Sequence, residues 1–158
     1  MNAGVSARFV VNTQCAVNRA GRYLMIVRGE GVMQAPGVLA FPGGKVEVGD
    51  GPDGVLEAAV RREVGEETGV TIAPELKYVR SVNFTMDDGT PVVDVLFLGT
   101  YKVGTPAITA PEEVADIRWM TAKETLAHER TPPWLKSDVE LVEAARRAFE
   151  SNERHGGD

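Results

Sequence analysis

Three glutamates, Glu63, Glu66 and Glu67, are the residues of this sequence whose type and spacing best suit chemistry. At about 100° per residue of helix, their carboxylates fall within or beside an apolar stripe and share an arc of roughly 100°. Carboxylates turned inward repel one another and lose hydration, which is costly unless a counter-charge is present. Arg62 can pair with Glu66 at i+4, but one arginine cannot neutralise three acids. The pattern therefore predicts a site for Mg²⁺ or Mn²⁺ rather than a solvated run of charges.

The segment around these acids carries the signals of a helix over about residues 54–68. Pro52-Asp53-Gly54 offers a start with Asp53 as the N-cap, and Gly69 offers a left-handed residue that ends the helix. The apolar stripe that should face the core consists of Leu56, Ala59, Val60 and Val64.

Two glycines and a lysine, Gly43, Gly44 and Lys45, precede this helix. Glycine lets the backbone approach a ligand closely, so a carbonyl can reach a metal or an amide can reach a phosphate. Lys45 can hold a phosphate as a point charge. Taken alone, however, the glycine pair would indicate only a turn, and the lysine could equally be a surface residue.

Net charge and length limit the classes of protein that fit. The formal charge of −6 argues against a broad electrostatic grip on nucleic acid, and a polyphosphate ligand would need cations. The 158 residues fit a single domain, 1–158, with no run of about 18 apolar residues and no leader pattern. Cys15 is the only cysteine, so no internal disulfide is possible. We expect a cytoplasmic monomer or homodimer that binds neither nucleic acid nor membrane.

The rest of the sequence predicts a sheet between helices. Strands are predicted over residues 8–17, 23–28, 77–84, 92–101 and 117–120. Residues 29–37 should form a loop, and Asp88-Gly89 should form the turn of a hairpin. Because the run from Val92 to Leu98 is nearly all apolar, the sheet should be covered on both faces.

Two helices should close the chain, each with a capping box, at Thr121-x-x-Glu124 and at Ser137-x-x-Glu140. The second helix has an apolar stripe that should pack on the body of the protein, formed by Leu135, Val139, Val142, Ala145 and Phe149. On the same helix Arg146 should face water, and residues 152–158 should be disordered.

The segment from Gly44 to Val70 resembles the Nudix box, Gly-x5-Glu-x7-Arg-Glu-(apolar)-x-Glu-Glu-x-Gly-(apolar). The C-terminal half of the box is complete from Arg62 to Val70, and the frequent family opening Phe-Pro-Gly-Gly-Lys-Val-Glu stands at residues 41–47. The spacing departs from the family pattern by four extra residues before Arg62. If Gly51–Gly54 is the insert, Asp50 takes the place of the first box glutamate.

This resemblance implies an α/β (α+β) fold, a Nudix-type α/β/α sandwich with a mixed central sheet. It also implies hydrolysis of a pyrophosphate bond by water, with Mg²⁺ or Mn²⁺ as cofactor. In the family pattern Glu63, Glu66 and Glu67 would be the metal ligands, with the carbonyl of Gly43 or Gly44 added. Glu66, Glu67 and Arg62 would then belong to the catalytic group, Arg62 by orienting the acids.

The resemblance also implies substrate contacts and a general base. Arg28, at the end of the second strand, and Lys45 would contact phosphate. The base in this family often comes from a loop before the last strand, where Glu112 and Glu113 stand; an exposed pair of loop acids is the alternative.

The substrate stays open at this point. Members that act on ADP-ribose tend to have a proline about fifteen residues past the box, and those that act on dinucleoside polyphosphates a tyrosine slightly further on. Neither stands here, which favours a nucleoside or deoxynucleoside triphosphate, including an oxidised one. ADP-ribose or another nucleotide sugar is the alternative substrate, and a non-catalytic, nucleotide-binding Nudix-fold regulator is the alternative of another class. Phe84, Trp119 and Trp134 could stack a base or serve in packing.

Overall fold

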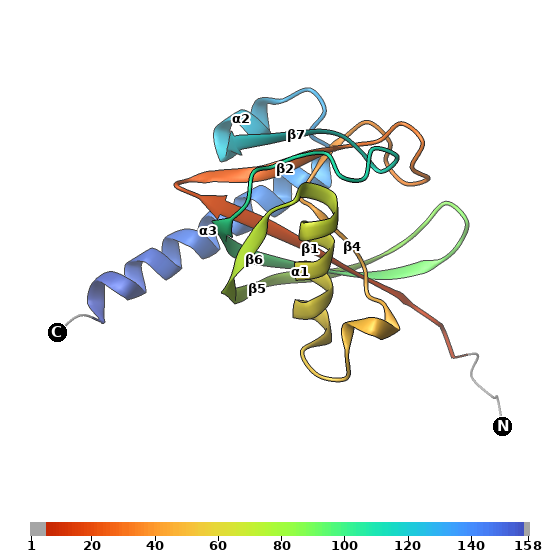
Figure 1. The fold of residues 1–158 in the computed structure, drawn as a ribbon, viewed down its shortest axis with the longest axis horizontal. Coiled ribbons are helices and arrows are strands. Elements are labelled where there is room, and N and C mark those ends of the chain that lie inside the picture. The colour runs from red at the N-terminus through yellow and green to blue at the C-terminus, as the bar shows by residue number, and fades with distance from the viewer. Residues whose placement is uncertain (1–5, 157–158) are drawn as a thin grey trace.

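A computed structural model describes residues 6–156 of the chain. Its strands are β1 (Val10–Arg19), β2 (Arg22–Arg28), β3 (Leu39–Ala40), β4 (Gly43–Lys45), β5 (Thr71–Thr85), β6 (Pro91–Val103) and β7 (Val114–Thr121). Its helices are the short 3₁₀ helix η1 (Val48–Asp50), α1 (Val55–Thr68), α2 (Ala122–Ala127) and α3 (Pro133–His155). Figure 1 shows how these elements are arranged. None of the helices in the described part of the chain is both long and apolar enough to cross a membrane.

The strands form one mixed sheet. β3, β2, β1, β6 and β5 are consecutive neighbours, while β4 pairs with β1 and β7 pairs with β2. β1 and β6 run parallel, and the other pairs are antiparallel. The β5–β6 hairpin turns at Asp88-Gly89, as the sequence predicted: Gly89 has φ 88° and Asp88 accepts a hydrogen bond from the Thr90 N–H at 2.9 Å.

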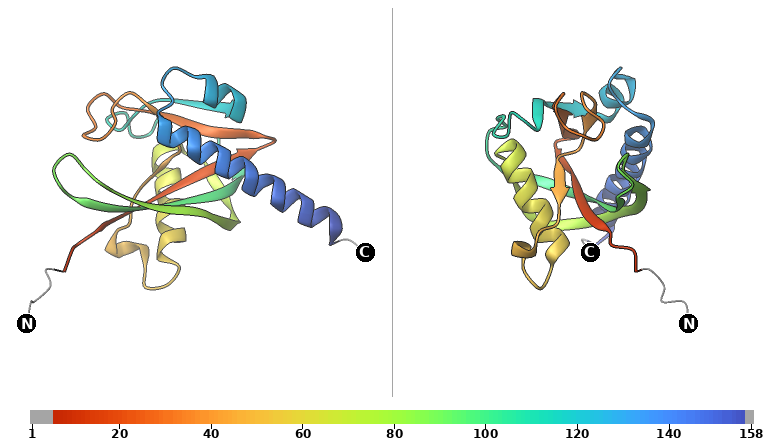
Figure 2. Two further views of the ribbon diagram at one scale, coloured as in Figure 1. Left: turned by 180° about the vertical axis from the view of Figure 1, so that it is seen from behind. Right: turned by 90° about the vertical axis from the view of Figure 1, so that its right-hand side faces the viewer.

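Helices cover both faces of this sheet, with α1 on one side and α3 on the other (Figure 2, right). On the α1 face, the sheet residues Cys15, Val17, Leu24, Val95 and Phe97 pack with Val60 and Val64. On the α3 face, the sheet residues Ala16, Tyr23, Met25, Leu96 and Leu98 pack with Leu135, Val139 and Val142. Successive residues of β6 thus enter both cores, which confirms the predicted α/β/α sandwich and explains the apolar run from Val92 to Leu98.

The two ends of α1 differ in how well the sequence predicted them. Gly69 ends the helix as expected, with φ 72° and its N–H bonded to the Gly65 carbonyl at 2.9 Å. The prediction of Asp53 as the N-cap was wrong, because the N-cap residue is Gly54, whose φ is 57°. Residues 51–54 form an exposed loop, and the left-handed Gly54 turns the chain from this loop into the helix.

The start of α3 was also predicted wrongly. The capping box at Thr121 and Glu124 is present in α2, but α3 begins at Pro133, so Ser137 lies inside the helix. Proline at the first helical position has a suitable φ and loses no intrahelical hydrogen bond, which favours this earlier start.

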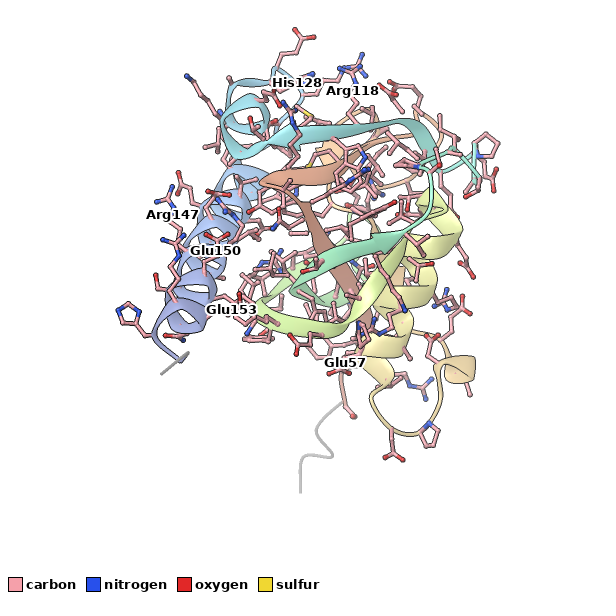
Figure 3. The ribbon with its side chains drawn as sticks, turned by 60° about the vertical axis from the view of Figure 1, so that its left-hand side comes forward. Glu57, Arg118, His128, Arg147, Glu150 and Glu153 are labelled. Atoms are coloured by element: carbon pink, nitrogen blue, oxygen red, sulfur yellow. The ribbon has the colours of Figure 1, made fainter. Side chains whose placement is uncertain are left out.

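The far end of α3 differs from the prediction as well. α3 continues to His155, so residues 152–155 are helical rather than disordered, while residues 157–158 lie outside the described range. Arg146 does not simply face water; it donates hydrogen bonds to Glu143 and to the Tyr23 hydroxyl. Figure 3 shows Arg147, Glu150 and Glu153 along this half of α3.

Candidate active site

α1 turns two of the three predicted ligands inward. Glu67 is 6% exposed, and the Glu63 side chain is 12% exposed. The Glu66 side chain lies at the margin of the buried stripe and is 60% exposed. Because Val60 and Val64 pack on the sheet, the helical phase leaves no other direction for Glu63 and Glu67.

Strand β4 places the glycine pair against these acids. The Gly43 N–H donates a hydrogen bond to a Glu67 carboxylate oxygen at 3.0 Å. A Cβ added to Gly44 would lie 2.3 Å from the carboxyl carbon of Glu63, so only glycine fits beside that side chain. Pairing of β4 with β1, with Gly44 opposite Thr13, holds the two glycines in this position.

Arg62 holds several groups around the acids. Its guanidinium donates to both Asp50 oxygens at 2.7 and 3.1 Å, to Glu63 at 2.9 Å and to Glu66 at 3.2 Å. It also donates to the Lys45 carbonyl at 3.0 Å. The bonds from Arg62 hold the pKa of Asp50 below its ordinary value. Asp50 therefore forms an ion pair with Arg62.

The electrostatics of the site favour bound positive charge. Burial raises the pKa of Glu67 to about 8, and the negative charges of Glu63 and Glu113 act in the same direction. The Gly43 N–H and the charge of Arg28 oppose this shift. Burial also raises the pKa of Glu63, despite its hydrogen bond from Arg62. A divalent cation would stabilise the ionised form of both acids.

The loop acids Glu112 and Glu113 are not equivalent. The charge of Glu113 is among the leading influences on the pKa values of Glu63, Glu67 and Arg28, and the charge of Glu112 is not. The Glu113 carbonyl also accepts a hydrogen bond from the Gly29 N–H at 2.8 Å. The sequence could not separate the two acids, because loop positions have no periodicity that fixes the direction of a side chain.

The two predicted phosphate contacts lie in different surroundings. Arg28 is half-buried at the end of β2, its Nε donates to the Gln34 carbonyl at 2.9 Å, and burial lowers its pKa. Lys45 is exposed and pairs in register with Asn12, so its side chain lies on the α3 face of the sheet. Hydrogen bonds from Thr90 lower the pKa of Asp88 in the β5–β6 turn, and the charge of Lys45 acts in the same direction.

The aromatic residues separate into packed and open ones. Trp119 packs edge-on against Tyr101, with ring centroids 5.8 Å apart, and Arg19 lies over both rings. Phe84 and Trp134 are 45% and 49% exposed and keep open faces. Of the two roles considered for these aromatic residues, base stacking and packing, Trp119 therefore has the packing role.

The donor atoms of this site suit a divalent metal ion, although the three predicted carboxylates do not lie together as one cluster. Within residues 6–156 no three Asp, Glu, His or Cys side chains already form a ready metal cluster, and Glu66 pairs with Arg62 instead. The carboxylates of Glu63 and Glu67 still meet the chemistry that Mg²⁺ and Mn²⁺ prefer, since both are oxygen donors beside a close backbone segment.

Sequence reasoning missed Ala107 and Thr109, which bind the β6–β7 connection to the end of α1. The Ala107 N–H donates to the Thr68 carbonyl at 2.9 Å, and the Thr109 hydroxyl donates to the Glu66 carbonyl. Neither residue belongs to a motif, so no signal in the sequence could have identified them.

Known proteins share both the motif and the fold. The NUDIX domain family matches residues 9–145. Phosphatase NudJ of Escherichia coli K12 is 26% identical over 147 residues, which cover 92% of this chain and 86% of NudJ. The crystal structure of the MutT protein from Methanosarcina mazei Go1 is 26% identical, with a TM-score of 0.73, over 90% of this chain and 98% of that one.

A third similar structure is the NUDIX domain of Shewanella oneidensis NrtR complexed with ADP ribose. It is 18% identical with a TM-score of 0.68, covers 94% of each chain and shows the fold alone. The family match spans most of the sequence and contains the buried glutamates, so the chain belongs to the Nudix family and is a hydrolase of pyrophosphate bonds in nucleoside diphosphate derivatives.

Proposed function

We propose that this hydrolase cleaves a pyrophosphate bond in a nucleoside or deoxynucleoside triphosphate, including oxidised forms, with Mg²⁺ or Mn²⁺. The observation that carries the proposal is the burial of Glu63 and Glu67 against Gly43 and Gly44. Buried neighbouring carboxylates need a cation, and a polyphosphate needs one too. The net charge of −6 strengthens that need for the substrate.

Glu63, Glu66 and Glu67 would hold the cation, and the carbonyl of Gly43 or Gly44 would add a further ligand. Glu66 would exchange part of its ion pair with Arg62 for this role. Arg62 would keep Glu63 oriented through its hydrogen bond. When bound, a divalent cation neutralises charge on the phosphates and lowers the pKa of a bound water.

Glu113 is the stronger candidate of the loop pair for removing a proton from the attacking water. Support comes from its charge, which is among the leading influences on the pKa values of Glu63, Glu67 and Arg28, whereas that of Glu112 is not. Glu112 stays the alternative base from the same loop.

Arg28 and Lys45 would bind phosphate oxygens from two directions. Arg28 is held by its bond to Gln34 and is close enough to Glu67 for their charges to interact. The Lys45 side chain leaves β4 on the face opposite to the acids, so it would be the outer contact, for a phosphate that extends past the edge of this strand. The exposed rings of Phe84 and Trp134 would be available to stack a base.

A panel of substrates tests the proposal. Nucleoside triphosphates, their oxidised forms, ADP-ribose, diadenosine polyphosphates and nucleotide sugars would be assayed with Mg²⁺, with Mn²⁺ and with chelator. We expect metal-dependent release of a nucleoside monophosphate from one or more triphosphates. Preferential cleavage of ADP-ribose or a nucleotide sugar would show that this compound, and not a triphosphate, is the substrate class. Tight binding of a nucleotide with no turnover of any compound would favour a regulator.

A further inference from the structure

The connection between β6 and β7, residues 104–113, closes the C-terminal end of α1; we call it the β6–β7 loop. The last carbonyls of a helix have no partner within the helix. Here the Thr109 hydroxyl donates to the Glu66 carbonyl, and the Ala107 N–H donates to the Thr68 carbonyl at 2.9 Å. The loop is therefore bonded to the same turn of α1 that carries Glu66 and Glu67.

Backbone hydrogen bonds within the loop connect this attachment to Glu113. The carbonyl of Ala110, next to Thr109, accepts hydrogen bonds from the N–H groups of Glu113 and Val114, both at 2.9 Å. The Glu113 carbonyl in turn accepts from the Gly29 N–H at 2.8 Å. Contact there is close, because a Cβ added to Gly29 would lie 2.9 Å from the Glu112 carbonyl oxygen. Glu113 is thus fixed from both sides, by α1 and by the end of β2.

We propose that Thr109 is a positioning residue, whose bond to the Glu66 carbonyl sets the distance between Glu113 and the acids Glu63 and Glu67. This inference rests on the proposed function, in which Glu113 removes a proton. Loops are ordinarily more mobile than the elements they join, and catalytic groups must be held within about 0.5 Å of their working geometry. The hydroxyl of Thr109 is exposed and acts here only through the backbone that it holds.

Three variants of the full chain test the role of Thr109. Thr109→Val removes the hydroxyl at nearly constant shape, Thr109→Ser keeps it, and Thr105→Val serves as control. Thr105 is an exposed threonine of the same loop whose hydroxyl makes no hydrogen bond within residues 6–156. We expect Thr109→Val to lower kcat about fivefold to tenfold, with KM changed less than about twofold, as loss of one hydrogen bond predicts. Thr109→Ser and Thr105→Val should stay close to the unaltered protein.

Amide hydrogen exchange in the metal-free protein gives a readout that does not depend on turnover. Thr109→Val should accelerate exchange of the Ala107 and Glu113 amides about fivefold, because the loop opens more often. The amides of β1 and β6 should be unaffected. Unchanged exchange at Ala107 and Glu113 would overturn the inference, since the hydroxyl would then hold nothing in place.

A double-mutant cycle with Glu113→Gln separates positioning from a general structural effect. If Thr109 acts through Glu113, Thr109→Val should cost no further activity in the Glu113→Gln background. Equal, multiplicative losses in both backgrounds would overturn the positioning role. Absence of turnover by the unaltered chain would instead contradict the proposed function, which the exchange data do not depend on.

Discussion

Glu67 stands in surroundings that a carboxylate tolerates poorly without a cation. It is buried, it accepts one N–H from Gly43, and the negative charge of Glu63 lies close by. These conditions raise its pKa to about 8, so in the metal-free protein it holds a proton at neutral pH. An acid at this position therefore fits the proposed role of Glu67 in binding a cation.

The raised pKa predicts how stability of the metal-free protein depends on pH. The unfolded chain releases the Glu67 proton near the ordinary glutamate pKa of 4.5, whereas the pKa of about 8 in the folded chain keeps the proton bound to higher pH. The folded state thus binds more protons in this window, and its stability must fall as pH rises from about 5 to 9. With chelator present, the free energy of unfolding measured in urea should decline over this pH range. Glu67→Gln should largely remove that decline. The decline should persist in Glu57→Gln, which changes an exposed acid of the same helix (Figure 3). Equal pH profiles for all three proteins would contradict the account of Glu67.

Gly44 gives a second prediction at this scale. Gly44→Ala would press a methyl group into the Glu63 carboxylate, at 2.3 Å from its carboxyl carbon. We expect Mn²⁺ affinity, measured by titration, to fall tenfold or more, about 1.4 kcal/mol. The matched change Gly49→Ala meets no atom within 4 Å and should leave affinity unchanged. Equal affinities for both variants would show that Glu63 does not bind the metal in this position.

Single residues also show what the sequence could reveal. The inward direction of Glu63 and Glu67 followed from helical phase, because every residue of a helix has a fixed direction once its apolar stripe is known. The choice of Glu113 over Glu112 did not follow, nor did the contact of Thr109, because a loop residue takes its direction from neighbours far away in the chain.

At the scale of elements, a buried ionic network joins α3 to the sheet. Arg80 of β5 forms ion pairs with Asp138 of α3 at 2.6 Å and with Asp94 of β6 at 2.8 Å. Asn12 of β1 donates to Asp94 at 2.5 Å. The three charged side chains are 11% exposed or less, so each depends on its partners for stabilisation.

Removal of the arginine from this network should be costly. Arg80→Ala leaves the carboxylates of Asp94 and Asp138 buried without their partner, and we expect a loss of about 3–5 kcal/mol in the free energy of unfolding. The control Arg118→Ala breaks an ion pair to Asp116 whose side chains are 52% and 41% exposed. That change should cost less than about 1 kcal/mol. Chemical unfolding measures both values, and similar losses would contradict the importance of burial.

Element types were easier to predict than their limits. The apolar run of β6 and the Asp88-Gly89 turn indicated a covered sheet and a hairpin, and both are present. The starts of α1 and α3 were misplaced, because Asp53 and Ser137 satisfy a local capping pattern. Backbone geometry at Gly54 and Pro133 decided the outcome instead. Local preferences of this size are overridden when the chain must turn at a given place to pack.

At the scale of the whole molecule, the two faces of the sheet carry different groups of charged residues. One face carries α1 and its buried acids, the other carries α3 and its ionic network, and β4 brings the glycine pair to the acids. The family motif covers only the first of these, whereas the match to the whole family domain extends over residues 9–145. An acidic molecule of this design needs a divalent cation to accept a polyphosphate.

The most direct test of this account is the turnover of a nucleoside triphosphate by the unaltered chain, by Glu67→Gln and by Glu57→Gln, each with Mg²⁺ and with chelator. We expect metal-dependent hydrolysis by the unaltered chain and by Glu57→Gln. In Glu67→Gln we expect the rate of hydrolysis to fall at least about a hundredfold, with circular dichroism unchanged. Unchanged hydrolysis by Glu67→Gln would contradict the claim that these buried glutamates hold the catalytic cation.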